Sequence, residues 1–140
     1  MQPWIINALL AMLFAGITAV LAKYGLKNVH PDFALGIRTT VIFALVLAVN
    51  LAGARFKEWA ALTTVQLWLL IASGVTTTLS WLYYYRAMKD GPVSYVAAID
   101  KGSIVITLVL SFLLLREPVT AKVLAGGGLV LAGLVVLVWK

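Results

Sequence analysis

Residues 94–116 read SYVAAIDKGSIVITLVLSFLLLR, an apolar run that carries one adjacent pair of opposite charges. The run is long enough to cross a bilayer as a helix, for which about 20 mostly apolar residues are needed. Asp100 and Lys101 follow Val93 by seven and eight residues, which is roughly 10 Å of helix at about 1.5 Å per residue. An ionised side chain inside the membrane costs about 2.5–3.5 kcal/mol on insertion scales. We therefore expect this pair to face a polar partner or a watery cavity.

The composition of the chain predicts an integral membrane protein. Of the 140 residues, 63% are hydrophobic and 11% are charged, whereas a soluble domain has about 25% charged residues. The absence of cysteine from the sequence excludes a disulfide framework and a thiolate metal site. The net charge of +6 comes from basic residues scattered near the ends of the apolar runs. Headgroup anchors are distributed in this way, so the charge does not favour nucleic acid as a partner.

The apolar runs predict five membrane-spanning helices joined by short loops, at residues 3–24, 33–52, 66–88, 93–115 and 120–139. We expect an all-α integral membrane protein with a single domain over residues 1–140. Pro3 suits a first helical turn, because its missing N–H would have no partner there in any case. Thr120 can cap the fifth helix. The N-terminal MQPWIINALL lacks a basic n-region and a small-residue cleavage site, so we interpret it as a first span.

The loop charges give almost no orientation for the five spans. We call the side of the membrane that holds the N-terminus face A and the opposite side face B. Face A carries four basic residues and face B five, namely Arg55, Lys57, Arg116 and Lys122 against Lys23, Lys27, Arg86, Lys89 and Lys140. The positive-inside rule assigns the orientation from an excess of basic residues on one side, and a difference of one residue gives it no clear answer. Either one or two dominant lysines or a partner settle the orientation, or copies insert both ways up, a dual topology that we favour.

Segments along the chain resemble the EamA half-unit of the drug/metabolite transporter superfamily. They are ITAVLAKYGLK at 17–27, the stretch 34–40 around Arg38, SWLYYYRAMK at 80–89, the GPVSYVAAI opening and LLLREP ending of 91–118, and LAGGGLVLAGLVVLV at 124–138. The resemblance covers nearly the whole chain. It implies one repeat of a ten-span inverted-repeat transporter, since most members look like two such units fused with inverted topology. It also implies a homodimer, because an inverted copy of this unit would rebuild the ten spans.

The sequence departs from that family in two respects. Ordinary half-units have an apolar or proline-containing stretch where Asp100 and Lys101 stand, so the pair marks a branch and leaves the substrate open. The four-span multidrug relatives exchange protons for cationic drugs through a glutamate in their first span. Here Glu58 and Glu117 both fall in predicted loops, so that mechanism does not carry over.

Three charged residues are predicted at nearly one depth below face B. Arg38 lies about 7 Å in if its span begins at Phe33, close to the depth of Asp100 and Lys101. Asp100 can bridge Arg38, which leaves Lys101 as a surplus positive charge and favours an anionic or zwitterionic metabolite. The alternative is that Arg38 and Lys101 both extend to the headgroups, whereas Asp100 is too short to do so. Asp100 is the one carboxylate inside the predicted spans, and so the candidate for proton coupling.

The third predicted span is the least apolar of the five. Thr77 and Trp81 lie in its face B half, where a hydroxyl and an amphipathic ring suit the wall of a translocation pathway. The alternative is a belt of aromatic residues at the membrane interface, which we favour for Tyr84 and Tyr85.

Small residues in the fifth predicted span indicate close helix packing. Gly128 and Ala132 form a small-xxx-small pair, and Gly126 and Gly133 are seven residues apart on one face. A similar glycine pair lies at the dimer contact of the multidrug relatives, and the resemblance implies the same here. Packing within one subunit is the alternative, and both remain open.

No catalytic grouping, metal-ligand spacing or phosphate-binding loop is visible in the sequence, so we expect neither an enzyme nor a cofactor. The features favour a secondary transporter subunit in the cytoplasmic membrane, working by alternating access on a small metabolite. The alternative is a non-transporting accessory or assembly subunit of a membrane complex. The substrate, the direction of transport and the coupling ion do not follow from the sequence.

Overall fold

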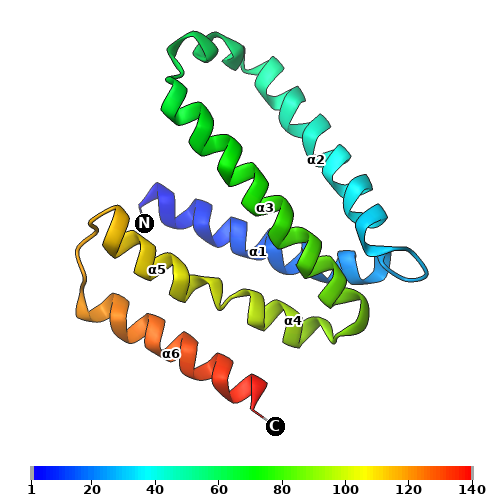
Figure 1. Cartoon of the computed structure of the whole chain (residues 1–140), viewed down its shortest axis with the longest axis vertical. Coiled ribbons are helices and arrows are strands. Elements are labelled where there is room, and N and C mark those ends of the chain that lie inside the picture. Colours follow the sequence, from blue (N-terminus) through cyan, green and yellow to red (C-terminus); the bar gives the residue numbers. More distant parts are fainter. Residues whose placement is uncertain (1, 140) are drawn as a thin grey trace. The chain divides into compact units, whose positions relative to one another are not determined.

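The computed structural model describes residues 2–139, and every regular element in that range is a helix (Figure 1). Met1 lies outside the described residues, as does Lys140, which the sequence places among the basic residues of face B. In chain order the elements are α1 (Pro3–Gly25), α2 (Pro31–Ala52), the 3₁₀ helix η1 (Arg55–Ala61), α3 (Thr64–Asp90), α4 (Val93–Asp100), α5 (Ser103–Leu114) and α6 (Ala121–Val138).

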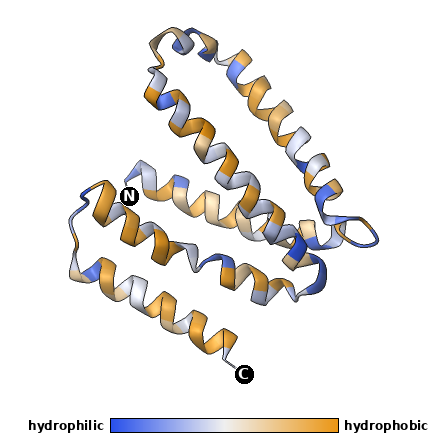
Figure 2. Cartoon of the chain, in the orientation of Figure 1, coloured by the Kyte–Doolittle hydropathy of each residue, from blue (hydrophilic) through white to orange (hydrophobic). Residues whose placement is uncertain are grey.

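Five stretches of helix are long and apolar enough to cross a membrane: α1, α2, α3, α4 joined with α5, and α6. Figure 2 shows hydrophobic residues along these helices and hydrophilic residues at the loops and at the junction of α4 and α5. Most of the large apolar side chains in the described range are exposed. An apolar surface of this extent belongs in lipid rather than in water. The predicted all-α protein with five membrane spans is therefore confirmed.

The contacts divide the chain into two compact units. The central unit is Val20–Asp90, and the terminal unit combines Met1–Ala19 with Gly91–Lys140. The central unit holds the end of α1 and the hairpin of α2 and α3, whereas the terminal unit holds the start of α1 and the helices α4, α5 and α6.

The buried residues of the central unit gather where α2 begins and α3 ends. Leu35 on α2 and Tyr85 and Met88 on α3 are buried, and Leu26 from the turn after α1 is buried with 2% of its surface exposed. Helices α2 and α3 contact each other. The core of this unit therefore lies toward face B.

Both helices of the hairpin begin at capping residues. His30 is the N-cap of α2, and its Nδ1 accepts a hydrogen bond of 3.3 Å from the N–H of Asp32, with Pro31 in the first helical position. At α3, Thr63 Oγ1 accepts from the N–H of Gln66 at 3.3 Å, and Gln66 Oε1 accepts from the N–H of Thr63 at 2.9 Å. This reciprocal pair is a capping box. These caps explain why both helices begin two residues before the predicted bounds.

The connection between α2 and α3 contains η1, which the sequence analysis treated as loop. Its N-cap residue Ala54 has a left-handed backbone with φ 50°, whereas the neighbouring Gly53 has φ −83°. A short 3₁₀ helix leaves little periodicity to detect, and the left-handed residue is not the glycine that such a position usually favours.

The fourth span is interrupted, although the sequence analysis treated residues 93–115 as one helix. Lys101 and Gly102 separate α4 from α5, with φ and ψ of −66° and −13° and of −60° and −20°. The N–H groups of Gly102, Ile104 and Val105 each donate to the carbonyl three residues earlier, at 2.8, 3.1 and 3.0 Å. These are the angles and bonds of a 3₁₀ turn. The chain tightens at the charged pair and stays right-handed.

Close contact with α6 explains the glycine at this interruption. A Cβ added to Gly102 would lie 2.9 Å from the carbonyl oxygen of Ile99 and 3.3 Å from Cδ1 of Leu134 on α6. A contact under 3.0 Å with backbone requires a shift of the chain. Gly102 is thus the residue that allows the tight turn and the packing of α4 on α6 together.

Candidate functional site

Arg38 lies between the two helices of the central hairpin, against two aromatic rings. Its guanidinium carbon is 4.4 Å from the centroid of the Trp81 ring and 5.6 Å from that of Tyr85. Its Nη1 donates a hydrogen bond of 3.4 Å to the Tyr85 hydroxyl. Trp81 and Tyr85 are four residues apart and therefore share one face of α3. A guanidinium over aromatic faces within about 6 Å is a cation–π interaction.

The direction of the Arg38 side chain bears on whether it reaches the headgroups. Arg38 follows the start of α2 at Pro31 by seven residues, roughly 10 Å of helix. Trp81 precedes the end of α3 at Asp90 by nine residues, roughly 13 Å. Because the guanidinium is closer to the deeper ring, its side chain crosses toward α3 at about its own depth. The Arg38 guanidinium therefore lies against α3 inside the hairpin.

Tyr85 corrects one expectation of the sequence analysis. The sequence pattern favours an aromatic belt at the membrane interface for Tyr84 and Tyr85, but Tyr85 has only 3% of its surface exposed and its hydroxyl accepts a hydrogen bond from Arg38. The sequence signal that could have found it is its spacing of four residues from Trp81.

Thr77 continues the same face of α3, four residues before Trp81. The hydroxyls of its neighbours bond their own helix, Thr76 to the carbonyl of Ser73 and Thr78 to that of Gly74, each at 2.9 Å. Among the hydrogen bonds within residues 2–139, none involves the Thr77 hydroxyl, and the residue is exposed. Thr77, Trp81 and Tyr85 therefore lie on one face of α3, and the exposed hydroxyl of Thr77, the deepest of the three, can bind a polar ligand.

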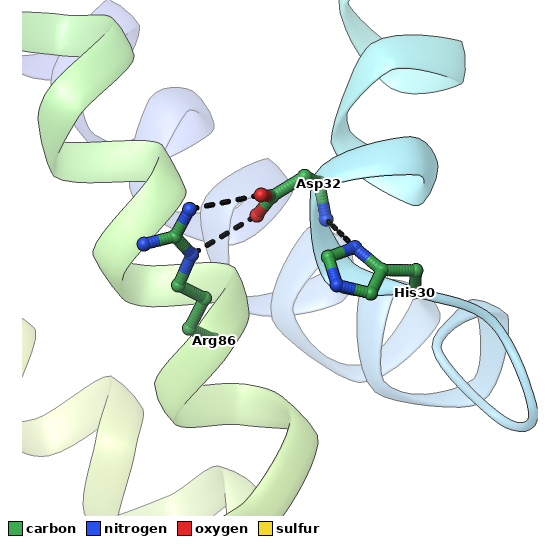
Figure 3. A network of polar contacts seen from close by, with 3 residues as sticks. All are labelled: His30, Asp32 and Arg86. Atoms are coloured by element: carbon green, nitrogen blue, oxygen red, sulfur yellow. Dashed lines mark hydrogen bonds and ion pairs between the residues drawn. The ribbon is translucent and has the colours of Figure 1, made fainter.

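A bidentate ion pair also joins α2 and α3, and the sequence analysis missed it (Figure 3). Arg86 Nε lies 3.0 Å from Asp32 Oδ1, and Arg86 Nη2 lies 2.8 Å from Asp32 Oδ2. The two residues are 54 positions apart. Because Asp32 is also the residue whose N–H bonds the His30 cap, one short segment both starts α2 and ties it to α3. The charge of Arg86 is thus matched by a specific partner.

Asp100 and Lys101 lie at the interruption of the fourth span, in the terminal unit. Lys101 Nζ is 3.4 Å from Asp100 Oδ2, and the two side chains are 64% and 38% exposed respectively. The backbone adds polar groups at this point. Among the backbone hydrogen bonds of the described residues, none uses the carbonyl of Asp100 or the N–H of Ser103. Arg38 belongs to the central unit, and its predicted pairing with Asp100 stays a prediction.

The glycines of α6 differ in what surrounds them. A Cβ added to Gly127 would lie 2.6 Å from Cδ1 of Leu108 on α5, so α5 and α6 approach each other closely at a glycine that the sequence analysis did not single out. At Gly126, Gly128 and Gly133, no atom in the described structure lies within 4 Å of an added Cβ. Ala132 is exposed as well. Both interpretations of this surface, a dimer contact and packing within the subunit, remain open.

The described residues hold no group of three His, Cys, Asp or Glu side chains that could bind a metal ion. The candidate groups of each unit are charges, rings and hydroxyls on membrane-spanning helices: Arg38, Trp81 and Thr77 in the central unit, and Asp100 and Lys101 in the terminal unit. Such groups inside spans mark the pathways of transported ions and solutes.

Within residues 2–139, five helical stretches of membrane-spanning length, one of them interrupted at a charged pair, define a multi-pass membrane protein. The chain belongs to the EamA-like transporter family, whose pattern it matches over residues 2–139. It is also similar to a Sinorhizobium sp protein named "Uncharacterized transporter in cobO 3'region", with 37% identity over 137 residues, 97% of this chain and 96% of the relative. No solved structure matches the chain.

Proposed function

We propose that the chain is one subunit of a homodimeric secondary transporter that moves a small anionic or zwitterionic metabolite across the cytoplasmic membrane by alternating access. The interrupted fourth span is the observation that carries the proposal. Transporters build their substrate and ion sites near the bilayer midplane from discontinuous helices, whose freed backbone groups and adjacent charges replace water around the solute. The turn at Lys101 and Gly102 supplies both.

The polar backbone at this turn supports a protein-lined or water-filled environment. In lipid, a backbone N–H or carbonyl without a partner costs several kcal/mol, so irregular backbone occurs only where protein or a wet cavity covers it. The carbonyl of Asp100 and the N–H of Ser103 are such groups among the described residues. A transported solute would bind where these groups and the ion pair of Asp100 and Lys101 meet the aqueous pathway.

Arg38 is the proposed anchor for a substrate carboxylate. A guanidinium has five N–H donors in its plane, and the rings of Trp81 and Tyr85 contact its face. One donor bonds the Tyr85 hydroxyl, which leaves edge donors for bidentate recognition of a carboxylate. With Trp81 and Thr77 on the same hairpin, this cluster would line the pathway.

The charges support an anionic or zwitterionic substrate. In the central unit Arg38 carries a positive charge inside its span, and in the terminal unit Asp100 and Lys101 balance each other at 3.4 Å. A cationic substrate would meet repulsion from Arg38. Asp100 is the proposed carrier of a coupled proton, because it lies well inside the fourth span, whereas Asp32 and Asp90 stand at the ends of α2 and α3.

The five-span length that this chain shares with its relative supports the proposed homodimer. The Sinorhizobium relative matches over 96% of its own length, so it too is about one unit long. An odd number of spans needs an inverted copy to rebuild a transporter with two inverted repeats. Reporters that distinguish the two sides of the membrane, fused after Lys140 and at the Arg55 loop, test the arrangement. Each fusion should report both compartments, whereas a single orientation for every copy would exclude the antiparallel homodimer.

Counterflow in proteoliposomes tests the substrate class. Proteoliposomes that contain the purified protein are each loaded with one unlabelled compound from a panel of small carboxylates, amino acids and organic cations. Uptake of the same compound in labelled form from outside is then measured. We expect carboxylates or amino acids to exchange, and Arg38→Gln to reduce that exchange at least tenfold. Arg55→Gln in η1 is the matched control, since its side chain is 67% exposed at the opposite end of the hairpin. Exchange of cations alone, or full exchange by Arg38→Gln, would contradict the proposal.

A further inference from the structure

Two lysines hold the ends of α1 and α3 together in a reciprocal arrangement. Lys23 Nζ donates to the carbonyls of Met88 and Lys89 at 2.6 and 3.2 Å. Lys89 Nζ donates in turn to the carbonyls of Leu26 and Val29 at 2.8 and 3.0 Å. The last carbonyls of a helix lack partners within it and form the negative end of its dipole. The Lys23 ammonium therefore stabilises the C-terminal end of α3, whereas the Lys89 ammonium holds the turn that follows α1.

These two lysines line a pocket with a third. The pocket has a volume of about 370 Å³ and lies entirely in the central unit, and its lining residues are Lys23, Tyr24, Leu26, Lys27, Asn28 and Lys89. The sequence analysis expected the basic residues to be scattered, but the fold brings these three lysines to one place. Asn28 turns the chain there with a left-handed φ of 62°.

The pocket is strongly positive. Its described lining residues contain three ammonium groups and no carboxylate. Hydrogen bonds to neutral carbonyls orient Lys23 and Lys89 but do not cancel their charge. Two carboxylates belong to the neighbouring chain segments: Asp32 is matched in a bidentate pair with Arg86, and Asp90, which follows Lys89, is not among the lining residues. Such a pocket attracts an anion, and an anion held there would meet Lys27, whose ammonium has no hydrogen bond among the described residues.

The position of the pocket identifies the kind of anion. It lies at the C-terminal end of α1 and the C-terminal end of α3, which are the ends of two membrane spans and therefore stand at headgroup depth. Tyr24, 77% exposed beside it, is the type of residue that accumulates at the membrane interface. Basic pockets between membrane helices at this level suit the headgroups of anionic lipids.

We infer that the pocket of Lys23, Lys27 and Lys89 is a binding site for the phosphate of an anionic phospholipid headgroup, one per subunit. The acyl chains of that lipid would lie along the exposed apolar surface of α1 below Tyr24, where Val20 and Leu21 are 50% and 65% exposed. The bound phosphate would stabilise the lysine arrangement that joins the two helix ends. This site is separate from Arg38 and does not depend on the substrate proposed above.

Native mass spectrometry of the intact protein in detergent tests this inference, with phosphatidylglycerol and phosphatidylcholine of equal chain length as the two probes. We expect one phosphatidylglycerol per subunit to bind more tightly than phosphatidylcholine. Lys27→Gln should weaken phosphatidylglycerol binding about fivefold, because a lysine near anionic lipid contributes about 1 kcal/mol. Lys57→Gln removes the same charge from the exposed η1 and should leave the binding unchanged.

Three results would overturn the inference. Equal retention of both lipids by the unaltered protein, or equal phosphatidylglycerol binding by Lys27→Gln and the unaltered protein, would remove the lipid site. Displacement of the lipid by millimolar glycerol phosphate, which carries the same phosphate without acyl chains, would instead assign the pocket to a soluble phosphate compound. The variant keeps all four lysine–carbonyl hydrogen bonds, so loss of binding cannot be attributed to loss of the arrangement at the helix ends.

Discussion

The guanidinium carbon of Arg38 on α2 lies 4.4 Å from the centroid of the Trp81 ring on α3. Arg38 lies seven residues inside α2, and the sequence pattern predicts that the Trp81 ring lines a transport pathway. The contact makes the orientation of Arg38 depend on Trp81, which leads to the first prediction.

Trp81→Ala should weaken substrate binding without abolishing insertion of the protein. Cation–π contacts contribute about 0.5–1 kcal/mol at exposed sites and about 2 when desolvated, so we expect KM for counterflow to rise roughly 2- to 30-fold. Trp81→Phe keeps a ring and should lose less. Trp68→Ala, also on α3 and 65% exposed, is the control. An unchanged KM in Trp81→Ala would mean that the ring only packs against α2.

The ion pair of Asp32 and Arg86 should be detectable by charge reversal. Asp32→Arg and Arg86→Asp each place like charges where the structure has a bidentate pair at 2.8 and 3.0 Å, so each should lower the thermal unfolding midpoint in detergent. The double variant restores opposite charges and should recover part of the loss. Effects of the two single changes that simply add in the double variant would show that the two side chains do not interact.

Gly102→Ala should destabilise the terminal unit. The added Cβ would lie 2.9 Å from the Ile99 carbonyl and 3.3 Å from Leu134, and overpacking of this kind costs typically about 1–3 kcal/mol. Gly16→Ala on α1 in the same unit, whose added Cβ meets nothing within 4 Å, is the matched control and should not lower the unfolding midpoint, because alanine has a higher helix propensity than glycine. Thermal unfolding of both variants checks this prediction. Equal midpoints would show that the chain around Gly102 and Leu134 shifts to accommodate the added methyl group.

Leucine at both Gly126 and Gly133 should abolish dimers in crosslinking if this face of α6 meets a second copy. Small residues let helices approach closely in lipid, and two large side chains on one face prevent it. Leucine at Gly74 on α3, which also has no atom within 4 Å of an added Cβ, is the control. Dimers that persist in the double variant would assign the face to the interior of the subunit.

Asp100→Asn should remove the pH dependence of transport. A carboxylate that binds and releases a proton during the cycle couples transport to pH, and an amide of the same size does not titrate. Asp90→Asn, at the outer end of α3, should keep the pH dependence. A pH profile that persists in Asp100→Asn would place the coupled proton on another group.

The membrane class and the five spans could be predicted because hydrophobicity is a local property. A run of about 20 apolar residues specifies a membrane helix without reference to any other part of the chain. The same holds for the cap at Thr120, whose hydroxyl accepts from the N–H of Val123 at 3.3 Å, three residues away. The resemblance to the EamA family could also be recognised from the sequence, because it rests on local segments and on the order and length of the spans.

The contacts between distant residues could not be predicted in this way. Asp32 and Arg86 are 54 residues apart, and the Lys23 ammonium bonds a carbonyl 65 residues away. Nothing local distinguishes these residues from other charges at span ends. Asp32 and Arg86 became partners because α2 begins beside the end of α3. Lys23 reaches the carbonyl of Met88 because α1 also ends there.

The sequence by itself determined that this chain spans a membrane five times and carries charges inside two of the spans, at Arg38 and at Asp100 and Lys101. Only the tertiary structure decided what those charges and their neighbours contact: Arg38 on Trp81, Asp32 on Arg86, and three lysines around one pocket. It also decided that the fourth span is interrupted at Gly102, where α6 packs against the turn. The physical reason is that apolar transfer into lipid adds up residue by residue, whereas polar pairing depends on which helices meet.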